Sequence, residues 1–119
     1  MSAAVESFRD LFVWQRSMEL TVVLYQLTKE FPADERYGLT SQLRRAGVSV
    51  ASNIAEGHSR LSTGEYKHFL GMARGSNSEI QTQLILAATL GFGDPIHIAK
   101  AEGLAREVAK MLDSLIHKL

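Results

Sequence analysis

The sequence contains no cysteine. This excludes disulfide bonds, thiolate nucleophiles and zinc sites built from cysteine, and it fits a reducing compartment. An excess of charge of one sign is also missing, because 13 Lys and Arg residues balance 13 Asp and Glu residues for a formal net charge of zero. Dedicated nucleic-acid-binding proteins usually have a strong basic excess, so the overall charge disfavours that class.

Long apolar runs are absent as well. No stretch approaches the roughly 20 apolar residues that span a bilayer. Residues 1–6 have neither the basic start nor the apolar run of a signal peptide. We therefore expect a cytoplasmic protein with no membrane partner. A chain of 119 residues is long enough for one modest core, so we expect residues 1–119 to form a single domain.

The apolar residues recur at the three- and four-residue spacing of amphipathic helices. The two prolines, Pro32 and Pro95, lie between such stretches, and tight strand-turn signals are lacking. The pattern predicts an all-α fold with helices over about residues 9–31, 35–56, 63–90 and 95–118. Because the connections are short, neighbouring helices should be antiparallel, which predicts an up-down four-helix bundle.

Cap and stop residues mark the ends of these helices. Pro32 should end the first helix, since the residue before a proline avoids the α region. We expect Asp34 to cap the second helix and Gly57 to end it. For the third helix, we expect Ser62 and Glu65 to form a capping box at the start and Gly91 to end it. For the last helix, we expect Asp94 to be the N-cap and Pro95 the first helical residue.

The first predicted helix is apolar around most of its circumference. One apolar stripe includes Met18, Val22 and Tyr25, and another includes Leu20 and Leu24. A surface helix of a lone bundle needs only one stripe. We therefore expect this helix to pack against neighbours on both sides, and we predict a homo-oligomer. The candidate interface residues are Phe12, Val13, Leu20, Val23 and Leu24.

The third predicted helix carries a stripe of small residues beside its apolar stripe. The small residues are Gly71, Gly75, Ser78 and Thr82. Glycine inside a helix costs about 1 kcal/mol relative to alanine. Two glycines four residues apart therefore predict a neighbouring backbone that approaches this stripe closely.

A set of polar residues lies on the second and third predicted helices. Its members are Gln42, Arg45, Asn53, Glu56 and Glu79. Our hypothesis is a structural network between the two helices in which Arg45 faces a glutamate, because buried polar groups usually need such partners. A network of this kind fixes register more than it adds stability. In the alternative interpretation, the same residues line a groove for a ligand.

Motifs for catalysis are incomplete. Glu65 and His68 have the Glu-x-x-His spacing of di-iron bundles, but the motif has no second copy, and Glu65 already has a capping role. Arg60 and His68 are too far apart for the arginine–histidine motif of helical ribonucleases. Ser, His and Asp occur without the local signature of a nucleophile elbow. We predict no catalytic residue, no metal site and no cofactor.

Three arginines are candidate contacts to nucleic acid, since guanidinium groups bind phosphate. They are Arg44, Arg60 and Arg74. In the alternative interpretation, these arginines belong to solvated helix faces, where such charges are usually found.

Several motifs taken together resemble one protein family. The segments that carry the resemblance are Asp10–Gln15, Phe31–Pro32, Tyr37–Ala46, Ser49–Gly57, and Ala73–Ser76 with Glu79. Over Phe8 to about Phe92, the sequence resembles the bacterial four-helix-bundle family encoded in intervening sequences of 23S rRNA genes. The resemblance implies a bundle that assembles into a ring-like homopentamer. It also implies a relation to an accessory protein of diversity-generating retroelements, which engages nucleic acid and a reverse transcriptase through a basic barrel surface.

Two functional expectations follow from the residues and the resemblance. The first is a non-catalytic, self-assembling helical scaffold whose partner is another copy of the chain. The alternative is an accessory protein that binds nucleic acid or a ribonucleoprotein.

Overall fold

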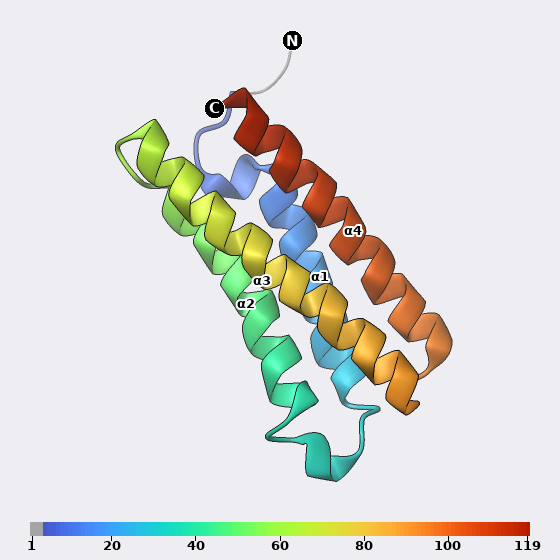
Figure 1. Ribbon diagram of the computed structural model, residues 1–119. Coiled ribbons are helices and arrows are strands. Elements are labelled where there is room, and N and C mark those ends of the chain that lie inside the picture. The colour runs from blue at the N-terminus through green and yellow to red at the C-terminus, as the bar shows by residue number, and fades with distance from the viewer. Residues whose placement is uncertain (1–3) are drawn as a thin grey trace.

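The computed structural model describes residues 4–119, which hold four α-helices, two short 3-10 helices and no β-strand. The helices α1 (Phe12–Thr28), α2 (Leu39–His58), α3 (Thr63–Leu90) and α4 (Pro95–Lys118) alternate in direction (Figure 1). Each helix packs against the next one along the chain, and α4 closes the bundle against α1. The predicted all-α four-helix bundle is confirmed. No helix within residues 4–119 is long and apolar enough to cross a membrane.

Helix α1 is shorter than predicted at both ends. Its expected first residues form a separate 3-10 helix, η1 (Phe8–Asp10), because Ser7 and Asp10 make a capping box of their own. The Oδ2 atom of Asp10 accepts hydrogen bonds from the backbone N–H groups of Glu6 at 2.9 Å and Ser7 at 3.1 Å. Leu11 is extended and separates this turn from α1.

The boundaries predicted for α2 were wrong in both directions. Residues Ala33–Glu35 form the 3-10 helix η2, and α2 begins only at Leu39. Glu35, rather than Asp34, supplies a cap, because its Oε1 atom accepts a hydrogen bond from the Leu39 N–H at 3.2 Å. At the other end, α2 continues through Gly57 to His58.

The ends of α3 and α4 are close to those predicted. The Ser62 Oγ atom accepts a hydrogen bond from the Glu65 N–H at 3.1 Å, and Asp94 Oδ1 accepts one from the Ile96 N–H at 2.8 Å. Gly91 ends α3 in the left-handed region, with φ of 75°, where a side chain would be strained. These caps depend on residues only a few positions apart, so the sequence was sufficient to predict them.

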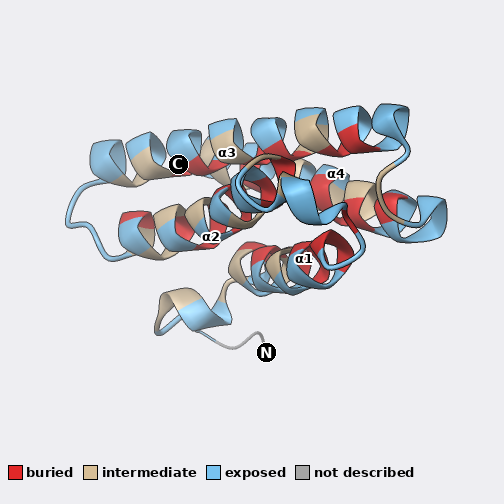
Figure 2. Cartoon of the chain, turned by 90° about the horizontal axis from the view of Figure 1, so that it is seen from below, coloured by how far each residue is buried: buried red, intermediate tan, exposed pale blue. Residues whose placement is uncertain are grey.

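The core runs along the bundle axis and receives side chains from all four helices. Figure 2 shows buried positions on each helix. Its largest fully buried apolar side chains are Leu20, Leu24, Leu27, Leu43, Val50, Ile54, Leu70, Ile80, Leu84, Val108 and Leu112. Asn77 is the polar exception in α3. Its Nδ2 atom donates a hydrogen bond to the Ala105 carbonyl of α4 at 2.8 Å, which ties two neighbouring helices together inside the core.

The small-residue stripe of α3 does not receive a neighbouring backbone. A Cβ atom added at Gly71 or Gly75 would find no heavy atom within 4 Å. The reason is helical phase, because these residues lie about half a helical turn away from the buried Ala73 and Ile80. The close approach between helices occurs at α2 instead, where a Cβ atom at Gly57 would lie 2.9 Å from the Cβ atom of Phe69.

Candidate functional site

A polar groove lies between the middle of α2 and the middle of α3. It has a volume of about 280 Å³. Its lining includes three members of the predicted polar set and residues that the set did not contain: Gln42, Arg45, Ala46, Ser49, Ser76, Glu79 and Gln83. The structure therefore brings Gln42, Arg45 and Glu79 together.

Hydrogen bonds cross the groove at two levels. The Gln83 Nε2 atom donates to Gln42 Oε1 at 3.2 Å, and the hydroxyls of Ser49 and Ser76 share a hydrogen bond at 2.8 Å. Asn53 supports the second level, because its Nδ2 atom donates to the Ser49 carbonyl at 2.8 Å and to the Ser49 hydroxyl at 3.0 Å. Part of the predicted interhelical network is thus present, but it is built from amides and hydroxyls.

The ion pair that we expected for Arg45 is absent from the described residues. Arg45 and Glu79 line the same groove from opposite helices, but neither belongs to an ion pair within residues 4–119. Both residues are exposed. Water screens charges at this surface position, so the chain folds without joining them.

Glu56 lies away from the groove, near the connection between α2 and α3. Its Oε1 atom is 2.7 Å from Arg60 Nη2, and Arg60 also lies 3.5 Å from Glu65 and over the ring of Phe69. Glu65 is the glutamate of the single Glu-x-x-His motif. Its side chain contacts Arg60, and its backbone N–H donates to the Ser62 cap of α3. Within residues 4–119, no three His, Asp or Glu side chains gather as they would around a metal ion.

The three candidate phosphate-binding arginines lie apart and have partners within the chain. Arg44 donates to the Thr28 hydroxyl at 2.8 Å and stacks over the ring of Tyr25. Arg74 on α3 lies 3.2 Å from Asp113 on α4. Arg60 belongs to the acidic cluster described above. The carboxylates beside Arg60 and Arg74 oppose the approach of a phosphate, because they repel anions.

Four of the five candidate interface residues are part of the chain's own core. Val13, Leu20, Val23 and Leu24 are buried, and Leu20 and Leu24 have no exposed area. We therefore correct the assignment of these four residues, since they offer no surface to a second copy. Phe12, in contrast, is 76% exposed.

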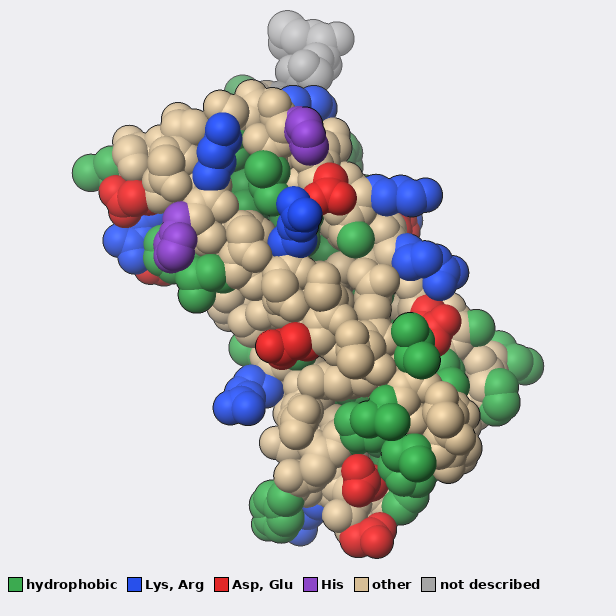
Figure 3. Space-filling model, in the orientation of Figure 1, with side chains coloured by type: hydrophobic (Ala, Val, Ile, Leu, Met, Phe, Trp, Pro, Cys, Tyr) green, Lys and Arg blue, Asp and Glu red, His purple; other side chains and the backbone are tan. Residues whose placement is uncertain are grey.

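The other apolar stripe of α1 remains on the surface. Met18, Val22 and Tyr25 are exposed along α1, and Val48 is exposed on the adjacent α2. The Arg44 guanidinium on α2 lies over the Tyr25 ring on α1, so these parts of the two helices are adjacent. We call the four apolar residues the outer α1 face. A second apolar group, Ile85, Leu86 and Leu90, is exposed near the end of α3, where hydrophobic side chains gather in Figure 3.

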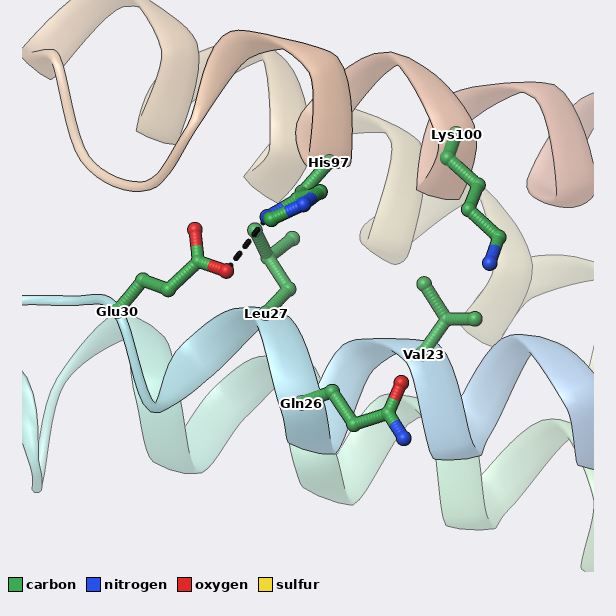
Figure 4. A pocket seen from close by; sticks show the side chains of 6 residues that line it. All are labelled: Val23, Gln26, Leu27, Glu30, His97 and Lys100. Atoms are coloured by element: carbon green, nitrogen blue, oxygen red, sulfur yellow. Dashed lines mark hydrogen bonds and ion pairs between the residues drawn. The ribbon is translucent and has the colours of Figure 1, made fainter.

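A contact that the sequence did not reveal joins the end of α1 to the start of α4. Figure 4 shows Glu30 and His97 pointing toward each other across a small pocket of about 150 Å³. The Glu30 Oε2 atom lies 2.6 Å from His97 Nδ1, and Glu30 Oε1 accepts a hydrogen bond from the Asp94 N–H at 2.8 Å. The residues are more than sixty positions apart, so no local motif could have indicated this contact.

Three side chains have shifted pKa values, and each shift has a structural cause. The hydrogen bond to the Glu19 carboxylate, together with the charge of Glu107, raises the pKa of Arg16. The backbone hydrogen bonds from Glu6 and Ser7 hold the pKa of Asp10 below its ordinary value of 3.8. Burial raises the pKa of Tyr66, whose ring packs edge-on against His58. Asp10, Arg16 and Tyr66 all lie outside the polar groove.

Comparisons with known proteins agree with this architecture. The family model of the 23S rRNA-intervening sequence protein matches residues 9–114. A crystal structure of a protein of unknown function from the S23 ribosomal protein family of Bacteroides thetaiotaomicron VPI-5482 has a similar fold, with a TM-score of 0.81. The sequences are 23% identical, and the match covers 88% of this chain and 95% of that chain, which shows a shared fold. No curated protein matches the sequence. Because the family model spans most of its length, the chain belongs to the 23S rRNA-intervening sequence protein family.

Proposed function

We propose that the chain is a non-catalytic helical scaffold that assembles with copies of itself. The observation that carries this proposal is the outer α1 face, where Val22 is 53% exposed and Met18, Tyr25 and Val48 are exposed beside it. Contiguous exposed apolar side chains on a folded domain are typical of interaction surfaces. Two copies that covered this face would remove apolar area from water, which favours association.

The family resemblance adds an expectation about the size of the assembly. It implies a ring-like homopentamer, whose mass would be five times the 13.2 kDa of one chain. A cyclic pentamer joins two different faces of each copy, so in such a ring the outer α1 face would meet another part of the surface.

Sedimentation equilibrium of the wild-type chain tests the proposal. We expect a mass that is a multiple of 13.2 kDa at high micromolar concentration. Val22→Glu should shift the mass toward that of one chain, because a carboxylate on the outer α1 face is costly to bury. Lys110→Glu, an exposed change on α4, is the matched control and should leave the assembly intact.

Either of two results would contradict this proposal. The first is a wild-type mass of 13.2 kDa at every concentration. The second is a Val22→Glu variant that assembles as the wild type does, which would remove the outer α1 face from the interface.

The positions of Arg44, Arg60 and Arg74 give little support to the alternative of nucleic-acid binding. Two of them are paired with carboxylates, and the third is held by Thr28 and Tyr25. Binding through phosphate contacts would weaken steeply as salt is added. We therefore expect a fluorescence anisotropy titration at low salt to show no binding of single-stranded RNA. Saturable binding that weakens as salt is added would favour the accessory-protein function.

A further inference from the structure

The polar groove between α2 and α3 is lined by an arginine and a glutamate that have no ion-pair partner within residues 4–119. Within residues 4–119, Arg45 is the one arginine on the four α-helices without an ion pair, a side-chain hydrogen bond or an aromatic contact. Glu79 is likewise the one glutamate on these helices without an ion pair. A cation and an anion that both lack partners therefore line one groove from opposite sides.

One residue that lines the groove has a polar atom without a partner. Gln83 Oε1 is buried and has no partner among the described residues, while Nε2 of the same amide donates to Gln42. Exchanging the oxygen and nitrogen of the amide would leave its nitrogen unpaired instead. One buried polar atom of Gln83 is thus free in either orientation, and buried polar atoms without partners are uncommon in folded proteins.

The groove is small, and it adjoins a second hollow of about 580 Å³ that Gln42, Glu79 and Gln83 also line. A volume of about 280 Å³ lies just below the range of roughly 300–1,000 Å³ that is typical of sites for drug-sized ligands. The groove therefore suits a small molecule of few heavy atoms.

We propose that this groove binds a small zwitterion of the free amino-acid type. The ligand carboxylate would lie against Arg45, because a guanidinium presents paired N–H donors that match a carboxylate. The ligand ammonium would lie against Glu79, and the amides of Gln42 and Gln83 with the hydroxyls of Ser49 and Ser76 would meet its polar atoms. A dianion such as phosphate fits less well, because Glu79 repels it.

An NMR titration of the full chain tests this proposal. The probes are the twenty common L-amino acids, added first as a mixture and then singly at millimolar concentration. For each amino acid that binds, two further probes lack one charge: the amine without the carboxylate and the acid without the amine. We expect saturable shifts of the backbone amide signals of Gln42, Ser49, Ser76 and Gln83.

Variants then test whether Arg45 binds the ligand carboxylate and Glu79 binds the ligand ammonium. Arg45→Gln and Glu79→Gln should each weaken the binding about tenfold or more, since each removes a charge-assisted hydrogen bond. The matched controls, Arg106→Gln and Glu102→Gln, remove an ion pair on α4 outside the groove and should bind as the wild type does. All four side chains are at least partly exposed, so we expect each variant to fold.

Three results would overturn the proposal. One is the absence of a saturable shift with any amino acid, and another is equally tight binding of a probe that lacks one charge. The third is wild-type affinity in both Arg45→Gln and Glu79→Gln. The titration is independent of self-assembly, because the groove is formed within one chain, and the mass of each sample is measured separately.

Discussion

Glycines in α2 and α3 face opposite environments, although each lies inside a helix. Gly75 is exposed, and a Cβ atom added there would meet nothing within 4 Å. Gly57 is buried, and the same atom would lie 2.9 Å from Phe69 Cβ and 3.2 Å from the Tyr66 carbonyl. A substitution by alanine should therefore change the stability in opposite directions at the two sites.

We predict that Gly75→Ala raises the free energy of unfolding by about 0.5–1 kcal/mol, because alanine restricts the unfolded chain and favours the helix. Gly57→Ala should lower it by about 1–3 kcal/mol, since α2 and α3 must separate to admit the methyl group. Urea unfolding followed by circular dichroism measures both changes. A destabilised Gly75→Ala variant would show that a partner covers the small-residue stripe of α3.

Asp10 gives a prediction for the dependence on pH. Its folded-state pKa is lowered, mainly by the backbone hydrogen bonds from Glu6 and Ser7. The carboxylate therefore stabilises the folded state fully above its ordinary pKa of 3.8, and this contribution is lost as the pH falls through the lower folded-state pKa. A carbon-detected NMR titration should find the Asp10 pKa below 3.8 in the folded chain and close to 3.8 in urea. Equal values in both states would contradict the capping role of Asp10.

At the scale of helices, Glu30 holds the end of α1 against the start of α4. Its carboxylate contacts both the Asp94 N–H and His97, and so it satisfies an N–H group at the N-terminus of α4. We predict that Glu30→Ala lowers the free energy of unfolding by about 1–2 kcal/mol, because two hydrogen bonds are lost. His97→Ala leaves the Asp94 bond in place and should cost about half as much.

The control for this prediction is Glu102→Ala, which removes an exposed ion pair of 3.8 Å within α4. Such pairs contribute about 0.5 kcal/mol or less. Urea midpoints of the three variants should therefore fall in the order Glu102→Ala, His97→Ala, Glu30→Ala, with the last the least stable. If Glu30→Ala is no less stable than Glu102→Ala, the contact between α1 and α4 is not a stabilising one.

At the scale of the whole molecule, self-assembly would couple stability to concentration. An association that involves only the folded state raises the apparent stability as the protein concentration rises. We predict that the thermal midpoint of the wild type increases between low and high micromolar concentration, whereas that of Val22→Glu stays constant. Differential scanning calorimetry measures both, and a wild-type midpoint that does not change with concentration would oppose the proposed scaffold.

The sequence by itself determined the fold class and the ends of α3 and α4. Apolar spacing indicated four helices, and the caps at Ser62, Gly91 and Asp94 lie within a few residues of the groups that they bind. The sequence also indicated that α1 has apolar side chains on two sides, because that property depends only on the helical period. These features are local, so the identity of neighbouring helices does not alter them.

Only the tertiary structure decided which of the two apolar sides of α1 faces the core. It placed Leu20 and Leu24 inside and Val22 outside, although all three lie on one apolar helix. It turned Gly75 outward and left Arg45 and Glu79 unpaired across one groove. The physical reason is that the rotation and spacing of a helix depend on close packing against side chains far away in the sequence, which no local pattern contains.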